Sequence, residues 1–571
     1  MSMNKMFRGL AFLAGASLLC AAPDIFPLRD VRAGQHGVGR TIFSGSRVED
    51  FQVEILGVLE NVGPGQSIIL ARLAGGPLDE TGVMQGMSGS PVYIDGKLVG
   101  AVALGFQLAK APIAGIRPIE EMLRVDPAAA PTRLASVPRT HVVNGGMRLE
   151  EIATPVSFSG FTSSALEHFA PQLRELGMDP RQGVSGGGRI PDTLGDPKLL
   201  EPGSMISVQL LAGDMSMSAD GTVTAIDGNK LYAFGHRFLA EGDTEMPFAR
   251  AEVLTLLPNL QSSFKISQAR EWMGVIRQDR NTAIAGLTGQ RAAMTPLEIH
   301  VSGNTYRMSM IQDRVMAPLV AQMALFSALD STGRTVGPAA YTVRSRLDFE
   351  SGPVTLNNSY SGDVSVAAVA SAGLASPLSY ALGSGFDAMK LKGVSIDVDV
   401  ADRRSQSQIA SVVTPRQVRP GGDLPITMVL AGDNGAEITK TVVYRVPVGA
   451  PPGTLSVTVA DASTTNLLEY QAVYGTPAHS PAQVLSLLNG LRSNTSAWVR
   501  VWRNETDYTV EGRDLPDPPP SIAMILGRAQ AGSTTLLNRG SKVAEIEMPE
   551  GSSVVTGSKT VQVEVKAEGQ Q

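Results

Sequence analysis

The sequence predicts a mainly β protein of several domains, and three observations support that prediction. The chain has 571 residues, which at roughly 150 residues per domain corresponds to three or four domains. Its 60 glycines and 36 prolines are typical of many tight turns between short strands. Only 5% of the residues are aromatic, so we expect the strands to pack around aliphatic cores.

Composition and charge exclude two classes of protein. About 43% of the residues are hydrophobic, which is too many for an intrinsically disordered polyelectrolyte. The chain carries 48 basic and 54 acidic side chains, for a net charge of −6. A nucleic-acid partner requires a basic surface, so we expect none.

Residues 1–33 have the pattern of a signal peptide and leader. Lys5 and Arg8 precede an apolar run over 10–22, which is followed by small residues. The run is shorter than the ~20 residues that cross a bilayer, so no permanent membrane span is expected. The sequence therefore predicts export across the inner membrane, to the periplasm, the envelope or the medium. The single cysteine, Cys20, lies in this segment, so the mature chain is expected to lack disulfides and thiol chemistry.

The first folded block, 34–125, is expected to be β. Apolar and polar residues alternate over 51–55, which is the period of a half-buried strand. Asp95 and Gly96 stand between two apolar runs, and this dipeptide is typical of a two-residue hairpin turn.

The next segments alternate between connectors and further β blocks. Residues 126–202 are expected to form a connector with an amphipathic helix, and residues 203–301 a second β block with a hairpin turn at Asp227 and Gly228. The remaining expectations are a mixed α/β connecting region over 302–404 with a buried helix at 315–329, a β-sandwich-like domain over 405–462, and a C-terminal α+β region over 463–571.

A serine within a glycine turn is the sharpest chemical feature. The stretch Gly86-Met-Ser-Gly-Ser-Pro91 precedes an apolar strand. A serine hydroxyl becomes a useful nucleophile in a tight turn beside a base, with N–H donors ready for the oxyanion. The pattern therefore favours Ser88 as nucleophile, with the N–H groups of Gly86 and Ser88 as the oxyanion hole. A plain loop is the alternative, because Gly, Ser and Pro mark turns in general.

The base for such a serine is expected to be a histidine. Among the six histidines, His236 stands out because it follows Tyr232-Ala-Phe-Gly235 at the end of the second predicted hairpin. A histidine just beyond a strand and beside a glycine can reach across a cleft. A structural histidine is the alternative interpretation.

Together, the serine and histidine motifs resemble the SpoIVB family of serine peptidases, which are chymotrypsin-like. The resembling segments are 81–102, 116–123, 221–236 and 274–281. The resemblance implies a two-barrel serine peptidase core, with a serine-bearing half at 34–125 and a histidine-bearing half at 203–301. The β-sandwich-like domain and a few helices would follow this core as accessory parts.

The chain departs from the family pattern in three ways. The serine half precedes the histidine half, so the two halves are in swapped order. No PDZ domain is recognisable. The acidic residue of the family has no matching carboxylate here: Asp79 is the nearest acid, Asp227, Asp243 and Asp279 are other candidates, and a Ser–His dyad without an acid is also open.

The resemblance implies acyl transfer, in which His236 takes the proton of Ser88 and Ser88 attacks a peptide carbonyl. The expected partner is a protein or peptide substrate, and self-cleavage is expected near the glycine-rich joint at 183–190. Neither a metal nor another cofactor is predicted. The alternative from another class is a catalytically inactive scaffold or binding protein of the cell envelope that keeps the peptidase fold.

Overall fold

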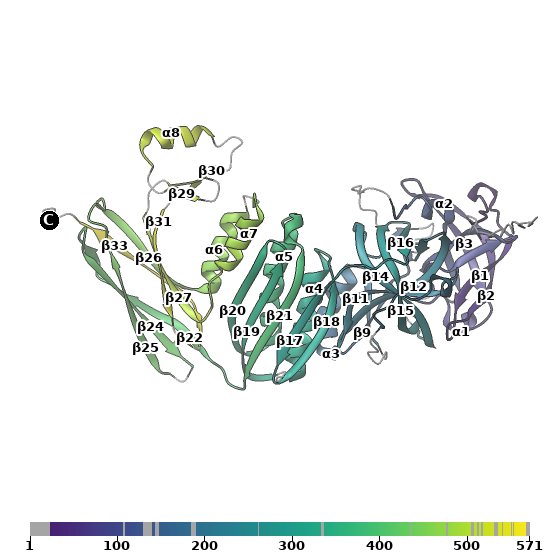
Figure 1. Ribbon diagram of the computed structural model, residues 1–571, viewed down its shortest axis with the longest axis horizontal. Coiled ribbons are helices and arrows are strands. Elements are labelled where there is room, and N and C mark those ends of the chain that lie inside the picture. The colour runs from purple at the N-terminus through teal and green to yellow at the C-terminus, as the bar shows by residue number, and fades with distance from the viewer. Residues whose placement is uncertain are drawn as a thin grey trace, which may run out of the picture.

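The computed structural model shows an elongated, mainly β protein, with 53% of the described residues in strands and 19% in helices. In Figure 1 the chain runs from a purple barrel at one end to a yellow-green sandwich at the other. The structure describes residues 23–106, 109–128, 140–142, 148–183, 190–260, 262–332, 336–433, 435–474, 478–503, 507–510, 513–515, 518–529, 535–538, 541–549, 551 and 553–566. Residues 1–22 of the predicted signal peptide and leader (1–33) and most of the glycine-rich joint, 184–189, lie outside these residues.

The first six strands close into a barrel in the order β4-β1-β2-β3-β6-β5, with β5 pairing back onto β4. The elements of this region are η1 (Leu28–Asp30), β1 (His36–Ile42), β2 (Val48–Gly63), β3 (Gln66–Ala74), α1 (Leu78–Thr81), β4 (Pro91–Ile94), β5 (Lys97–Phe106), β6 (Ile113–Pro118), α2 (Ile119–Met122), β7 (Thr140–Val142) and β8 (Arg148–Glu151). The last two strands extend the sheet beside β5.

Local sequence explains the strands of the first barrel. Phe51, Val53 and Ile55 are buried and alternate with polar residues along β2, as the period-two pattern predicts. Asp95 and Gly96 both have positive φ and join β4 to β5, which confirms the predicted hairpin turn.

A second six-stranded ring follows in the order β12-β13-β16-β15-β14-β11, closed by pairing between β11 and β12. Its elements are β9 (Thr154–Ser159), α3 (Ser163–Glu175), β10 (Met178–Gln182), η2 (Pro197–Leu199), β11 (Met205–Gly213), β12 (Ser216–Asp227), β13 (Lys230–Ala233), β14 (Gly242–Leu257), β15 (Phe264–Arg280) and β16 (Ala283–Thr288). Strands β9 and β10 of the predicted connector join the same sheet beside β12, and the predicted amphipathic helix is α3.

The second sheet continues past β11 into a layer of strands covered by helices (Figure 1). The added elements are β17 (Met294–Val301), β18 (Asn304–Ile311), α4 (Met316–Thr332), β19 (Val336–Phe349), β20 (Gly352–Val364), α5 (Val366–Gly383), η3 (Asp387–Met389) and β21 (Leu391–Ala401). Helix α4 is buried along almost its whole length, which confirms the predicted buried helix.

Helix α5 has the length and hydropathy of a membrane span, although only 39% of that window is buried. It is the one such helix among the described residues. Because α5 packs against α4 and strands β19 and β20, its apolar side chains also serve the core of this layer.

Two sheets form a C-terminal sandwich around a shared aliphatic core. The elements of this C-terminal region are β22 (Gln406–Val413), β23 (Gln417–Val418), β24 (Asp423–Gly432), β25 (Glu437–Arg445), β26 (Gly453–Asp461), α6 (Ala462–Tyr474), α7 (Pro481–Asn489), β27 (Ser496–Arg503), β28 (Asp507–Val510), β29 (Arg513–Leu515), α8 (Pro520–Ala529), β30 (Thr535–Asn538), β31 (Ser541–Pro549), β32 (Val554–Thr556) and β33 (Ser558–Val565). Strands β28, β29 and β30 form a separate three-stranded sheet outside the sandwich. The sandwich therefore draws strands from 463–571 as well as from 405–462, because β26 pairs with β27 and β33.

Candidate active site

Two glycines give the serine turn, residues 86–90, its sharp bend. Gly86 has a φ of +89° and Gly89 a φ of +96°, a region of backbone space that favours glycine. A Cβ at Gly89 would lie 2.0 Å from the carbonyl oxygen of Thr222 and 2.6 Å from the backbone nitrogen of Phe234. Glycine therefore lets the serine turn approach the second barrel more closely than any other residue would.

Strand β12 of the second barrel fixes the carbonyl groups of the serine turn. The Thr222 N–H donates to the Ser88 carbonyl, and the Thr222 hydroxyl donates to the Gly86 carbonyl, both at 2.8 Å. The Thr224 hydroxyl donates to the Gly89 carbonyl at 2.7 Å. Within the described chain, the N–H groups of Gly86 and Ser88 donate no hydrogen bond, so both can serve an incoming oxygen.

The histidine turn, residues 234–240, follows β13 and lies against the first barrel. Phe234 and Gly235 have φ values of +69° and +71°, and for a phenylalanine this conformation costs on the order of 1–3 kcal/mol. A Cβ at Gly235 would lie 3.0 Å from the Cβ of Ala103 in β5. Arg117 Nε donates to the Gly235 carbonyl at 3.4 Å. The first barrel thus holds the strained backbone that presents His236.

A backbone carbonyl sets the tautomer of His236. Nδ1 of the ring lies 2.7 Å from the carbonyl oxygen of Arg237. A carbonyl oxygen only accepts hydrogen bonds, so Nδ1 carries the proton. In the neutral ring Nε2 then holds the lone pair, which is the state that a general base requires.

A buried carboxylate organises the rest of the histidine turn. The carboxylate of Asp279 on β15 accepts hydrogen bonds from the backbone N–H groups of Phe238 at 2.8 Å, Leu239 at 2.6 Å and Ala240 at 2.7 Å. Burial raises the pKa of Asp279, and these backbone hydrogen bonds act in the opposite direction. Asp279 therefore shapes the backbone that follows His236.

The other aspartates considered from the sequence lie in different places. Asp79 is exposed in the first turn of α1, and Asp227 is the last residue of β12, just before the hairpin turn to β13. Asp243 forms an ion pair with Arg280 at 3.5 Å. Of the four candidates, Asp279 is the one with hydrogen bonds to the histidine turn, and it binds backbone groups there.

Two buried ion pairs lie next to the histidine turn. Arg117 and Glu121, both in the first barrel, are 1% and 6% exposed and lie 3.5 Å apart. Arg237, beside the histidine, lies 3.4 Å from Glu151 of β8, and both side chains are buried. Buried charges require such partners, so removing one member would destabilise the contact between the barrels.

Ser88 and His236 are both closed off from solvent. Their exposed fractions are 0% and 1%. The Ser88 hydroxyl makes no hydrogen bond to any described residue, so the Ser88–His236 hydrogen bond is not formed in this conformation. Catalytic hydrogen bonds are often long before substrate binds, and a substrate would require the two barrels to open here.

Three further residues of this region carried no distinct signal in the sequence. Thr222 binds the serine turn, Arg117 binds the histidine turn, and Lys265 packs against Gly86. Along β15, Phe264 and Ile266 are apolar on either side of Lys265, a pattern that predicts an exposed lysine. The structure places Lys265 inward instead, because that face of the strand lies on the serine turn.

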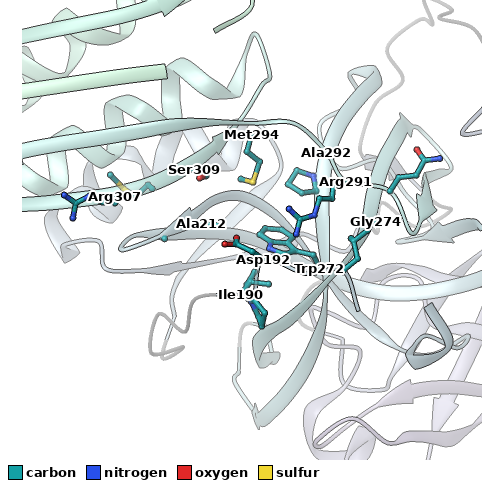
Figure 2. A pocket seen from close by; sticks show the side chains of 16 residues that line it. Ile190, Asp192, Ala212, Trp272, Gly274, Arg291, Ala292, Met294, Arg307 and Ser309 are labelled. Carbon is teal, nitrogen blue, oxygen red and sulfur yellow. The ribbon is translucent and has the colours of Figure 1, made fainter. Parts of the chain in front are cut away.

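A separate cavity of about 650 Å³ lies between the second barrel and the following layer of strands (Figure 2). Its walls include Trp272, Arg291, Met294 and Asp192, and no residue of the serine turn lines it. No group of three or more metal-binding side chains occurs within the described part of the chain.

Two facing six-stranded barrels, with a glycine-flanked serine on one and a histidine turn on the other, define the chymotrypsin-like class of fold. Residues 23–123 match the family model described as SpoIVB peptidase S55, which confirms the resemblance for the serine-bearing half. No curated protein and no solved structure matches the chain. The family match stops before β11, so the resemblance of the histidine-bearing half stays a prediction.

Proposed function

We propose that the protein is an exported serine endopeptidase that cleaves peptide bonds with Ser88 as nucleophile and His236 as general base. The observation that carries the proposal is the hydrogen bond from His236 Nδ1 to the Arg237 carbonyl, which leaves Nε2 as the basic nitrogen. The family match supports peptidase chemistry at the level of the class, and it includes the serine turn.

The mechanism follows from the groups of the two turns. His236 Nε2 takes the proton of the Ser88 hydroxyl while Ser88 Oγ bonds to the carbonyl carbon of the substrate. The N–H groups of Gly86 and Ser88 hold the resulting oxyanion. The imidazolium then gives its proton to the leaving amine, and the C–N bond breaks. Water next attacks the acyl carbon while His236 takes a proton from it, the bond to Ser88 Oγ breaks, and the proton passes from His236 to Ser88 Oγ.

The group beside His236 Nδ1 is a backbone carbonyl and not a carboxylate. We infer that the Arg237 carbonyl orients His236, because it already accepts the Nδ1 proton. A neutral carbonyl stabilises an imidazolium less than a carboxylate does, so we expect slower turnover than with a full triad. Asp79, which the sequence offers as the third residue, is exposed on α1, and its role stays a prediction.

A protein or peptide substrate, with self-cleavage as one case, fits the surroundings of the serine turn. Gln85, next to the turn, donates to Asp179 of β10 at 2.9 Å, and Arg181 of β10 lies over the Phe264 ring at 4.6 Å. The chain therefore passes beside the serine turn just before the glycine-rich joint. Cleavage within 184–189 stays a prediction, since these residues lie outside the described ones.

Export rests on the sequence of the first 22 residues. The basic start and the short apolar run support a cleaved signal peptide, and the family match begins at residue 23. The N-terminal sequence of the protein recovered from the periplasm or medium would test this, and an intact Met1 in that fraction would contradict cleavage.

A non-catalytic scaffold is the second candidate, and the closed site is the observation that favours it. Ser88 and His236 are 0% and 1% exposed, and the Ser88 hydroxyl binds no described residue. A scaffold would keep the barrels packed in this way, whereas a peptidase must open them to admit a substrate.

The test is labelling of the full chain with a fluorophosphonate probe, which reacts with activated serine hydroxyls. We expect the wild type to label, Ser88→Ala to lose all labelling, and His236→Gln to lose about a thousandfold in rate, since the base is gone. Mass spectrometry would place the label on Ser88. Unchanged labelling of Ser88→Ala would contradict the assignment of Ser88 as nucleophile, and no labelling of a folded wild type would support the scaffold.

Two further variants in the same labelling experiment test the third triad residue and the identity of the labelled serine. Asp79→Asn removes the exposed carboxylate, and we expect its rate to stay within about threefold of wild type because a backbone carbonyl holds Nδ1. Ser90→Ala removes the other hydroxyl of the turn and should still label. A hundredfold loss in Asp79→Asn would restore Asp79 as the third member of a triad.

A further inference from the structure

Lys265 is a buried lysine without a carboxylate partner. It lies on β15 of the second barrel, and its exposed fraction is 1%. Within the described chain, no carboxylate lies within ion-pair distance of its amine. An isolated ammonium group is costly to bury, so an ion pair does not explain why Lys265 is buried here.

The stem of Lys265 supports the first residue of the serine turn. The backbone of β15 pairs with Gln85: the Gln85 N–H donates to the Ser263 carbonyl at 2.9 Å, and the Lys265 N–H donates to the Gln85 carbonyl at 3.2 Å. A Cβ built on Gly86 would lie 3.2 Å from Lys265 Cδ. The aliphatic stem of Lys265 therefore covers Gly86, whose N–H is one of the two proposed oxyanion donors.

The amine of Lys265 reaches the other end of the same turn. Nζ donates to Thr41 Oγ1 at 2.7 Å, and Ser90 Oγ donates to the same oxygen at 3.1 Å. Thr41 and Ser90 are both fully buried. One hydroxyl on β1 thus connects the lysine of the second barrel to the last residue of the turn that carries Ser88.

We propose that Lys265 is a positioning residue for the serine turn: its stem fixes Gly86, and its amine fixes Ser90 through Thr41, so that Ser88 and the oxyanion donors hold a reactive geometry. The proposal rests on the proposed function, because it assigns Lys265 to the reaction of Ser88. It assigns no contact with substrate to Lys265, and His236 remains the base.

The charge state of Lys265 agrees with this role. Burial lowers the pKa of the Lys265 amine to about 7, so the group is largely uncharged above neutral pH. An uncharged amine still donates to Thr41, and it avoids most of the cost of a buried cation.

The test is a double-mutant cycle on Lys265→Met and Thr41→Val in the full chain. Lys265→Met keeps the stem and removes the amine, and Thr41→Val keeps the volume and removes the hydroxyl. The rate of Ser88 labelling at saturating probe and the probe concentration for half-maximal rate are measured for each variant. We expect each single variant to lose about tenfold in maximal rate with unchanged half-saturation, because a displaced turn reacts more slowly. The double variant should be no slower than the slower single variant.

Ser267→Ala is the matched control on the same strand. The Ser267 hydroxyl is buried two residues from Lys265, but it donates to Asp220 at 2.6 Å and not to Thr41. We expect the labelling rate of Ser267→Ala to stay within about twofold of wild type. In the double variant with Lys265→Met, the fold-losses of the two single variants should multiply, as they do for independent sites. The unfolding free energies of the same Lys265 and Thr41 variants, measured by chemical denaturation, give the coupling energy between the two side chains without any labelling reaction.

The outcomes separate this proposal from the proposed function. A folded wild type that never labels contradicts the proposed function, and the unfolding cycle then decides whether the Lys265–Thr41 contact exists. Wild-type labelling rates in Lys265→Met, or rate losses that multiply in the double variant, overturn the positioning role. If Lys265→Met does not fold, Thr41→Val combined with Ser90→Ala tests the same connection from its other end.

Discussion

The serine turn is held by groups of the opposite barrel, whereas the histidine turn is held by groups of both barrels: Arg117 belongs to the first barrel and Asp279 to the second. Side-chain hydroxyls and a buried lysine support the serine turn, through Thr222, Thr224 and Lys265. Backbone contacts and buried charges support the histidine turn, through Arg117 and Asp279. Both turns make hydrogen bonds to the opposite barrel, so the contact between the barrels and the geometry of the site depend on each other.

The two turns also respond to burial in opposite directions. Burial lowers the pKa of Lys265 beside the serine turn and raises that of Asp279 beside the histidine turn. Asp279 finds several backbone N–H donors, whereas Lys265 has one hydroxyl acceptor. The serine turn should therefore be more sensitive to pH than the histidine turn. The histidine turn should be more sensitive to removal of the Asp279 carboxylate, which accepts its backbone N–H groups.

The largest expected effect comes from Gly89→Ala in the serine turn. Its Cβ would overlap the Thr222 carbonyl, 2.0 Å away, in a backbone conformation with φ of +96°. We expect a loss of about 3 kcal/mol or more in unfolding free energy, measured by chemical denaturation, together with loss of Ser88 labelling. Gly96→Ala is the control: φ is +76°, no atom lies within 4 Å of the added Cβ, and a cost of about 1 kcal/mol is expected. Equal costs for the two would contradict the close approach.

A smaller effect is expected from Asp279→Asn in the histidine turn. The amide keeps one acceptor oxygen but turns an N–H₂ group toward the donors of residues 238–240. We expect about 2 kcal/mol less unfolding free energy and at least a tenfold slower labelling of Ser88, since the turn that carries His236 shifts. Asp243→Asn, in the neighbouring ion pair with Arg280, is the control and should label at nearly the wild-type rate. A labelling rate unaffected by Asp279→Asn would show that the histidine turn does not need this carboxylate.

The pH dependence of stability due to Lys265 is the smallest effect when it is measured per pH unit. The pKa of this amine is about 7 in the folded protein against an ordinary 10.5, so between these values the unfolded chain binds a proton that the folded chain does not. Stability therefore rises with pH over that interval, by at most about 1.4 kcal/mol per pH unit from this group. Unfolding measured from pH 7 to 10 should show this rise in wild type relative to Lys265→Met. Parallel curves for the two proteins would show that Lys265 is charged in the folded state.

Much of the fold follows from local sequence. The alternation over 51–55 and the turn at Asp95-Gly96 predicted a strand and a hairpin that the structure contains. The second predicted hairpin is also present, but its turn consists of residues 228–229, one position later than predicted. The apolar stretch at 315–329 predicted the buried helix α4. These signals succeed because they concern residues close together in the chain, where side-chain periodicity and turn conformation determine the outcome.

The serine turn was also visible in the sequence, because glycines beside a serine mark a backbone that exposes N–H groups. The partners of that turn were not visible. Lys265 lies between two apolar residues in a strand, and Thr222 lies in an ordinary β hairpin, so neither differs from an exposed residue of its kind. The preference for Asp79 came from its nearness to the serine in the chain, whereas His236 contacts a carbonyl of its own neighbour.

The sequence by itself determined the strand content, the hairpins and the serine and histidine motifs, since each depends on neighbours within about twenty residues. The tertiary structure alone decided which faces meet: the closure of two barrels, the approach of Gly89 to Thr222, and the burial of Lys265 against Gly86. The physical reason is that the contacts between the barrels, such as those of Gly89 with Thr222 and of Gly86 with Lys265, join residues more than a hundred positions apart. Their energies depend on burial and hydrogen-bond geometry that arise only when both barrels have folded and packed together.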